Sequence, residues 1–309
     1  MEIRMKIDLF HIPTNIVDTS KFNNLLHGEI VETFESNFRT YVNARYSVSL
    51  NSATNAIFLI SKLWGSDSKI PTLIPPVVAN AIITAGNKVT FTDNIHWIGD
   101  SYNLDLGIKD FKVIDSAQKV GRGQFEFECN DSDLMIFSLY PTKPLSSADG
   151  CVVVSNDKEK IELLKLYSFN GMSTENNNWE RKQKVIGYKM YLASISAFIA
   201  NDNLKTIDEK YLKLKTIREK YNDAFSLSNI SNHIYRINIQ DRDKFLLKAK
   251  QENIVCGIHY NPIHLNPIFN QTYLSLPNSE AEAKTTVSIP YHEKLSKQDI
   301  EKIIKLVNG

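Results

Sequence analysis

The sequence predicts an α/β fold in which a sheet of short strands is flanked by helices. Two runs, residues 134–139 and 151–155, have the length and the continuous apolar character of buried strands. Residues 28–43 instead repeat apolar side chains every three or four positions, which is typical of an amphipathic helix. Polar residues directly follow several strand runs. We therefore expect a large domain with a mostly parallel sheet and a ligand site along one edge of it.

The first half of the chain alternates these two patterns. The first helix carries Val31, Phe34, Phe38 and Tyr41 on one stripe. A short alternating strand at residues 46–50 is followed by small polar residues 51–54 and then by an apolar helical run at 56–63. Further strands are expected at residues 70–74, 88–91, 111–114, 134–139 and 151–155, with a helix at 78–85.

Beyond residue 157 the sequence becomes helical and charged. We expect helices at residues 158–167, 190–200 and 204–225, a strand at 233–239, and a last helix that begins after the N-cap Ser296. The Asn-rich residues 173–179 predict a mobile loop. The pattern indicates a large domain over residues 1–203 and a smaller C-terminal α/β domain over 204–309, which starts with a long connecting helix.

Composition excludes several functional classes. The chain has 309 residues, 42% of them apolar, and a net charge of +1, so no long-range field attracts nucleic acid or an anionic membrane. Residues 70–86, the longest apolar stretch, are broken by three prolines and are too short to span a bilayer. The N-terminus lacks the pattern of a signal peptide, and we expect a cytoplasmic protein. Neither a GxGxxG motif nor a P-loop occurs, and we expect no metal site.

Lys143 is the first candidate for chemistry. Taken alone, a loop lysine is usually a solvated charge. Lys143 differs because it follows the apolar strand 134–139 and lies between Pro141 and Pro144, which limit the directions that its ammonium can take. A lysine in a desolvated pocket loses proton affinity and can act as a nucleophile or base.

Asp115 ends another buried run, Val113-Ile114. Such an aspartate can simply cap a turn. If its carboxylate is desolvated, however, it needs a cationic partner, and a protonated ring nitrogen is one such group.

Small polar residues supply a possible anion site. Ser52 to Asn55 lie where a strand passes into a helix, so Ser52 can be a plain N-cap. Together with Ser138, at the end of another strand, the same residues can instead form a phosphate cup from hydroxyls and backbone N–H groups.

In this chain order, these residues resemble the DegT/DnrJ/EryC1/StrS family of PLP-dependent sugar aminotransferases, which have the aspartate-aminotransferase fold type I. The resemblance covers nearly the whole chain. The matching pieces are Phe34-Glu35 with Phe38 and Tyr41, Ser52-Ala53-Thr54, Asn80-Ala81-Ile82 with Gly86, Ile114 to Gln118, Phe137 to Lys143, Asp149-Gly150, residues 258–264 and Val287 to Pro290.

The resemblance implies a role for each matching residue. Lys143 would form a Schiff base with pyridoxal 5'-phosphate (PLP) and move protons during transfer. Asp115 would pair with the pyridine nitrogen, and Gln118 would contact the ring or its hydroxyl. Thr54, Asn55 and Ser138 would hold the phosphate. Related dehydratases carry His at the lysine position, so Lys143 favours transamination over dehydration.

The sequence departs from the family pattern in three places. Pro75 stands where the family has an aromatic residue that stacks on the cofactor ring. Lys189 stands where an Asn reaches the phosphate of the neighbouring subunit, and it is either a replacement donor or a surface lysine. Only about twenty residues join Asp93 to Asp115, so either a central strand and its helix are missing or that strand survives at residues 95–99.

The resemblance further implies a substrate class and an assembly. We expect amino transfer, with glutamate as donor, to a keto-deoxysugar nucleotide in surface polysaccharide or amino-sugar biosynthesis, carried out by a homodimer. His259, Tyr260 and His264 are candidate substrate contacts, or else polar residues of a domain-interface loop. The alternative, motivated by Pro75 and the shortened sheet, is a non-catalytic relative that acts as a binding or regulatory subunit.

Overall fold

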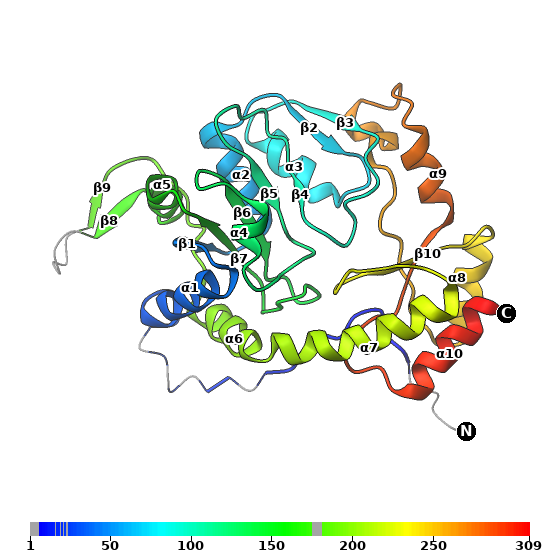
Figure 1. The fold of residues 1–309 in the computed structure, drawn as a ribbon. Coiled ribbons are helices and arrows are strands. Elements are labelled where there is room, and N and C mark those ends of the chain that lie inside the picture. Colours follow the sequence, from blue (N-terminus) through cyan, green and yellow to red (C-terminus); the bar gives the residue numbers. More distant parts are fainter. Residues whose placement is uncertain (1–5, 16, 19, 21, 23, 175–180) are drawn as a thin grey trace.

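A five-stranded sheet forms the centre of the large domain (Figure 1). The computed structural model describes residues 6–309 except 16, 19, 21, 23 and 175–180. The strand order is β1-β7-β6-β5-β4. The α/β class expected from the sequence is confirmed. The strands of this sheet are β1 (Tyr46–Leu50), β4 (Tyr102–Asn103), β5 (Val113–Asp115), β6 (Leu134–Ser138) and β7 (Cys151–Ser155).

The strand directions are more mixed than in the mostly parallel sheet that we expected. Within this sheet β5 and β6 are parallel, while β1 and β6 each run antiparallel to β7, and β4 runs antiparallel to β5. A helix-free loop joins β6 to β7, and a chain without a crossover returns antiparallel. A separate parallel pair is formed by β2 (Ser68–Pro71) and β3 (Val89–Thr92).

Both faces of the central sheet are buried. Successive side chains of one strand enter different cores: Phe137 packs on Phe38 of α1, with ring centroids 4.9 Å apart, whereas Ile136 enters the core shared with α2 and α3. The helices of one face are α1 (Glu29–Val42) and α6 (Ser194–Lys205); those of the other are α2 (Ala53–Trp64), α3 (Pro76–Thr84) and α5 (Lys158–Ser168).

The long helix α7 (Ile207–Phe225) connects the two domains (Figure 1). Its Ile207 lies in the core of the large domain and its Tyr221 in that of the small one. α10 follows Ser296, which forms a capping box with Asp299. The other elements are α4 (Gln124–Glu128), β8 (Met172–Thr174), β9 (Arg181–Gln183), β10 (Tyr235–Asn238), α8 (Arg242–Gln251), η2 (Ile263–Leu265), η3 (Pro267–Phe269), α9 (Pro277–Thr285), β11 (Thr286–Ile289) and α10 (Lys297–Asn308).

Two segments cross the expected domain boundary near residue 204. Ile7 pairs with Ile254 and lies in the core of the small domain. Ile263 donates its N–H to the carbonyl of Thr72 at 3.1 Å and lies in the core of the large domain. Tertiary contacts thus carry one segment from each side of residue 204 into the core formed by the other side.

Two of the expected elements differ in extent. α6 begins at Ser194 instead of near residue 190, because the Met190 carbonyl accepts the Asn51 N–H at 2.7 Å and keeps the chain extended there. The loop expected at residues 173–179 is partly strand, since Ser173 and Thr174 belong to β8; its residues 175–179 lie outside the described part of the chain. None of the helices in the described part combines the length and apolar character needed to cross a membrane.

The shortened region between β3 and β5, residues 93–112, is here called the connector. Its β4 pairs with β5, and the carbonyl of Asp105 accepts the Lys69 N–H of β2 at 3.0 Å. The connector thus lies between β5 and β2, where a full strand would join the two sheets. Residues 95–99 form no strand and end in a turn, so the alternative that placed a strand there is wrong.

Candidate active site

A pocket of about 460 Å³ opens beside the ends of β5 and β6 and the N-terminus of α2. This volume falls in the range of small-molecule sites, roughly 300–1,000 Å³. Thr54, Asp115, Gln118, Ser138 and Lys143 all line it, so the structure brings together five of the residues selected from the sequence. They meet because β5 and β6 are parallel neighbours and end at the same edge of the sheet.

Lys143 lies in the loop that follows β6. Its backbone N–H bonds to the Tyr140 carbonyl at 2.9 Å, which closes a tight turn before Pro144. Burial lowers the pKa of the Lys143 ammonium, and the charge of Asp115 opposes that shift. More of this lysine is therefore neutral and nucleophilic near neutral pH than of a solvated lysine.

Asp115 is held in place by two hydrogen bonds at the end of β5. Its Oδ1 accepts the Ala117 N–H at 2.9 Å, and its Oδ2 accepts the Tyr102 hydroxyl at 3.1 Å. Burial raises the pKa of this carboxyl, although the Ala117 N–H, the Lys143 charge and the Tyr102 hydroxyl lower it. Only 5% of the residue is exposed. A cationic ring nitrogen in the pocket would offset this desolvation.

The N-terminus of α2 supplies an anion-accepting end to the pocket. Ser52 caps the helix by accepting the Asn55 N–H at 3.1 Å, and the N–H groups of the first turn have no partner within the helix. The Thr54 side chain and Ser138 line the pocket beside them. Asn55 does not: its amide bonds to Asn51 at 2.8 Å. The phosphate cup predicted from the sequence therefore loses Asn55.

The Gln118 carboxamide is engaged at both of its ends. Its Oε1 accepts the Gly99 N–H at 2.6 Å, and its Nε2 donates to the Tyr260 hydroxyl at 2.7 Å. Gln118 therefore links the connector to the small domain while it lines the pocket.

The predicted substrate residues occupy three different environments. Tyr260 reaches the pocket through Gln118. His259 bonds to Ser288 at 2.8 Å, and burial, with the charges of Lys143 and Arg236, lowers its pKa to about 4. His264 is fully buried and bonds to Thr72 at 2.8 Å, away from the pocket. The structure thus places His264 in a bond between η2 and the chain after β2, where it cannot touch a ligand in this pocket.

Lys189 is exposed and does not line the pocket of its own chain. It pairs with Phe169, and its neighbour Met190 contacts the turn before α2. Among the residues described, no ion pair holds the Lys189 ammonium, and Lys189 lines no cavity of its own chain.

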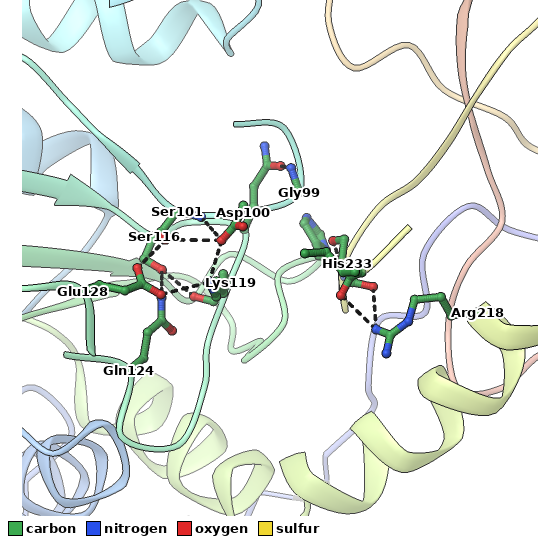
Figure 2. Close-up of polar contacts among 12 residues, drawn as sticks. Gly99, Asp100, Ser101, Ser116, Lys119, Gln124, Glu128, Arg218 and His233 are labelled. Atoms are coloured by element: carbon green, nitrogen blue, oxygen red, sulfur yellow. Dashed lines mark hydrogen bonds and ion pairs between the residues drawn. The ribbon is translucent and has the colours of Figure 1, made fainter. Parts of the chain in front are cut away.

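The connector is fixed against the loop that follows β5. Figure 2 shows Lys119 between the carboxylates of Asp100 and Glu128, at 2.7 and 2.9 Å. In the same view, Arg218 of α7 binds the carbonyls of residues 230 and 231, close to His233. A small cavity of about 80 Å³ separates Asp100 and Lys119 from residues 230–232. The connector therefore forms the rim where the two domains meet.

Sequence reasoning missed two aromatic residues of the site. Trp97, from the connector, lines the pocket, and Tyr102 bonds to Asp115. No local signal identifies Trp97, because its position depends on how the connector folds. Ala117 was within the recognised motif and also lines the pocket. Pro75 is on the wall as well, so the aromatic side chains there are Trp97 and Tyr140 among the described residues.

A lysine with a lowered pKa and a buried carboxylate line one pocket that also has an anion-accepting helix end. These features are those of an α/β enzyme with a small-molecule site. The chain belongs to the DegT/DnrJ/EryC1/StrS aminotransferase family, whose model matches residues 11–106 and 113–308. The unmatched residues 107–112 lie in the connector.

Relatives match along most of their length. The spore coat polysaccharide biosynthesis protein SpsC of Bacillus subtilis is 24% identical over 94% of this chain and 92% of its own. That alignment spans 358 positions against 309 residues here, so the relative has stretches that this chain lacks. A UDP-4-amino-4,6-dideoxy-N-acetyl-beta-L-altrosamine transaminase of Campylobacter jejuni is 25% identical over 89% of this chain and 88% of its own.

The fold is also that of solved aminotransferases. PseC of Helicobacter pylori, an aminotransferase involved in the biosynthesis of pseudoaminic acid, superposes with a TM-score of 0.80. The superposition covers 97% of this chain and 98% of PseC at 19% identity. The fold type I architecture is therefore shown despite the shortened connector.

Proposed function

We propose that this protein is a PLP-dependent aminotransferase that moves an amino group from glutamate to the keto group of a nucleotide-linked deoxysugar. The product would serve surface polysaccharide or amino-sugar biosynthesis. The observation that carries the proposal is that Lys143 and Asp115 line one pocket and influence each other's pKa. The family and the curated sugar transaminase among its relatives support the substrate class.

The residues of the pocket fit PLP. The first turn of α2, with the hydroxyls of Thr54 and Ser138, suits a phosphate dianion. The Asp115 carboxylate suits a protonated pyridine nitrogen, and the Lys143 amine, whose pKa burial lowers, suits an aldehyde carbon. When bound, PLP supplies an electron sink beside the substrate carbon.

The protein itself contributes a proton carrier and fixed charges. Lys143 Nζ, with its lowered pKa, can take up the proton that leaves the substrate carbon and return it later. Asp115 would keep the ring nitrogen of bound PLP cationic, and its two hydrogen bonds hold the carboxylate in place for that role. His259 and Tyr260 are the candidate contacts for the sugar nucleotide, on the side of the small domain.

We further propose a cytoplasmic homodimer in which Lys189 of one subunit binds the phosphate in the pocket of the other. Its support is that Lys189 is exposed and lies beside the turn that leads into α2. A lysine ammonium is a suitable point-charge donor for a phosphate.

The test is to trap the lysine linkage. Purified protein with PLP should be yellow, and borohydride should fix the cofactor on Lys143, as peptide mass mapping would show. Lys143→Ala should abolish the fixed linkage, whereas Lys109→Ala, at an exposed connector position, should leave it intact. Glutamate should then bleach the yellow wild-type protein. Protein that stays colourless with added PLP would rule out the catalytic proposal, and colour without bleaching would favour the non-catalytic relative.

A further inference from the structure

The connector places an indole in the cofactor pocket. Trp97 is 5% exposed and lines the same cavity as Asp115 and Lys143. It comes from the segment that stands where a full strand would join the two sheets. The shortened chain therefore fills part of the pocket wall with a side chain that a longer sheet would not supply.

The polar atom of this indole lacks a partner. Trp97 Nε1 is buried, and within the described part of the chain no acceptor lies in hydrogen-bond range of it. Buried polar groups in folded proteins are nearly always bonded, so each exception needs an explanation. Because Trp97 lines the pocket, a group bound there can supply the missing acceptor.

Neighbouring rings hold the indole in one orientation. The Tyr102 ring lies 4.5 Å from the Trp97 ring, and the Tyr260 ring is stacked at 6.0 Å with an interplanar angle of 8°. Tyr102 is bonded to Asp115 and Tyr260 to Gln118. These contacts fix the plane of the indole beside the pocket, so that a ligand bound there meets its edge.

The other polar groups of the pocket leave one acceptor on PLP for Trp97. The phosphate suits the first turn of α2, where Thr54 and Ser138 line the pocket. The phenolic oxygen is the acceptor that remains for Trp97, whose ring contacts Tyr102, the partner of Asp115. Gln118, which the family resemblance assigned to this hydroxyl, already bonds to Gly99 and Tyr260.

We propose that the Trp97 Nε1–H donates a hydrogen bond to the phenolic oxygen of bound PLP. This inference rests on the proposed function. A donor on that oxygen would stabilise its anionic form and weaken its hold on the proton of the nitrogen that joins Lys143 to the cofactor. Trp97 would thereby lower the pKa of that nitrogen, so that more of it is unprotonated near neutral pH.

The first measurement is a visible-absorption pH titration of full-length protein loaded with PLP. Trp97→Phe keeps an apolar aromatic ring and removes the donor, together with part of the ring volume. Its titration midpoint should rise by about one pKa unit or more, and its dissociation constant for PLP should rise roughly tenfold. The titratable groups around Trp97 are unchanged in the variant; they are Asp100, Asp115, Tyr140, Lys143 and Asp149 on the pocket wall, with Tyr102 and Tyr260 against the indole.

Trp64→Phe is the matched control. Trp64 lies at the end of α2 against Phe111 and does not line the pocket, so neither the midpoint nor the affinity should change. If Trp97→Phe titrates and binds PLP like the wild type, Trp97 is only a packing residue and the inference is overturned. If the wild type itself binds no PLP, the proposed function fails, and this outcome is visible before any variant is compared.

A second readout does not require Trp97 to be replaced. The chain has three tryptophans, and the variant with Phe at positions 64 and 179 keeps only Trp97. Its single indole N–H resonance should move downfield and exchange more slowly when PLP is added. A 3-deoxy analogue of PLP, which lacks the phenolic oxygen, should leave the resonance near its unliganded position. An equal shift with both compounds would contradict the assigned acceptor.

Discussion

At the residue scale, Asp115 and Lys143 work as a pair whose pKa values are moved toward each other. Burial disfavours the charged form of both, so the pKa of the acid rises and that of the amine falls. The charge of each group opposes the pKa shift of the other. A ligand that brings a cation to Asp115 and an aldehyde to Lys143 relieves both penalties, which is the physical reason to regard this pair as functional.

Asp115→Asn should separate activity from stability. Without the negative charge the ring nitrogen loses its proton more readily, and each lost pKa unit corresponds to about 1.4 kcal/mol, or tenfold. We expect glutamate-driven bleaching to slow by at least roughly tenfold, measured by stopped-flow absorbance.

The stability of the same variant without cofactor should move the other way. The pKa of Asp115 is raised above its ordinary value of 3.8, so its favourable contribution is present below 3.8 and is lost as pH rises through the folded-state pKa. At neutral pH the Asn variant should therefore unfold at an equal or higher temperature than the wild type. The difference between the two unfolding temperatures should shrink in acid. A variant that melts earlier at neutral pH would contradict this assignment.

At the element scale, a buried acid joins the first helix to the first strand. Glu35 of α1 accepts the N–H and the hydroxyl of Ser49 in β1, at 2.7 and 2.6 Å. Burial raises the pKa of Glu35, although Ser49 and the charge of Lys165 lower it and Glu32 raises it further. The two Ser49 bonds therefore favour the carboxylate, but burial outweighs them and makes ionisation of Glu35 unfavourable in the folded protein.

Glu35→Gln should reduce the pH dependence of stability. Below its ordinary value of 4.5, Glu35 carries a proton in both states; as pH rises past 4.5, the unfolded chain ionises first and the free energy of unfolding falls. Gln keeps the accepting oxygen without the charge. In urea unfolding, the free energy of unfolding of Glu35→Gln should rise relative to that of the wild type as the pH increases from acid to neutral. Glu301→Gln, on an exposed position of α10, should show no such trend. If the free energies of unfolding of the wild type and Glu35→Gln change in parallel with pH, the predicted effect of Glu35 ionisation is contradicted.

Most elements were predictable because their signals are local. Phe34 and Phe38 mark the buried stripe of α1, and Ser296 marks the start of α10. The errors occur where a long-range contact decides the local conformation. Met190 is extended because it pairs beside β1, and no property of its neighbours in sequence reports that contact.

At the scale of the whole molecule, the proposed homodimer can be tested by complementation. Lys143→Ala lacks the reacting amine, and Lys189→Ala would lack the phosphate donor offered to the partner. If Lys189 serves the other subunit, unfolding and refolding the two variants together should create mixed dimers with one intact site. Activity should then exceed that of either variant alone. A mixture no more active than its parts would show that Lys189 acts in its own chain or not at all.

The sequence by itself determined the α/β class, most helices and strands, and the core of the site. Asp115 and Ser138 could be found because each ends a strand whose pattern is visible locally, and Lys143 because it lies between two prolines in the loop directly after such a strand. The pattern also located the shortened region, since a missing segment changes the spacing between motifs.

Only the tertiary structure decided which residues surround that core. It brought Trp97 to the pocket wall and Tyr102 to Asp115, and it bonded both ends of the Gln118 carboxamide. It placed Asn55 and His264 outside the pocket. It also set the mixed strand directions of the sheet. These outcomes depend on strand pairing and on the path of the connector between the domains. Such contacts join residues far apart in the chain, and the free energy that selects them comes from packing and hydrogen bonds that no local stretch of sequence contains.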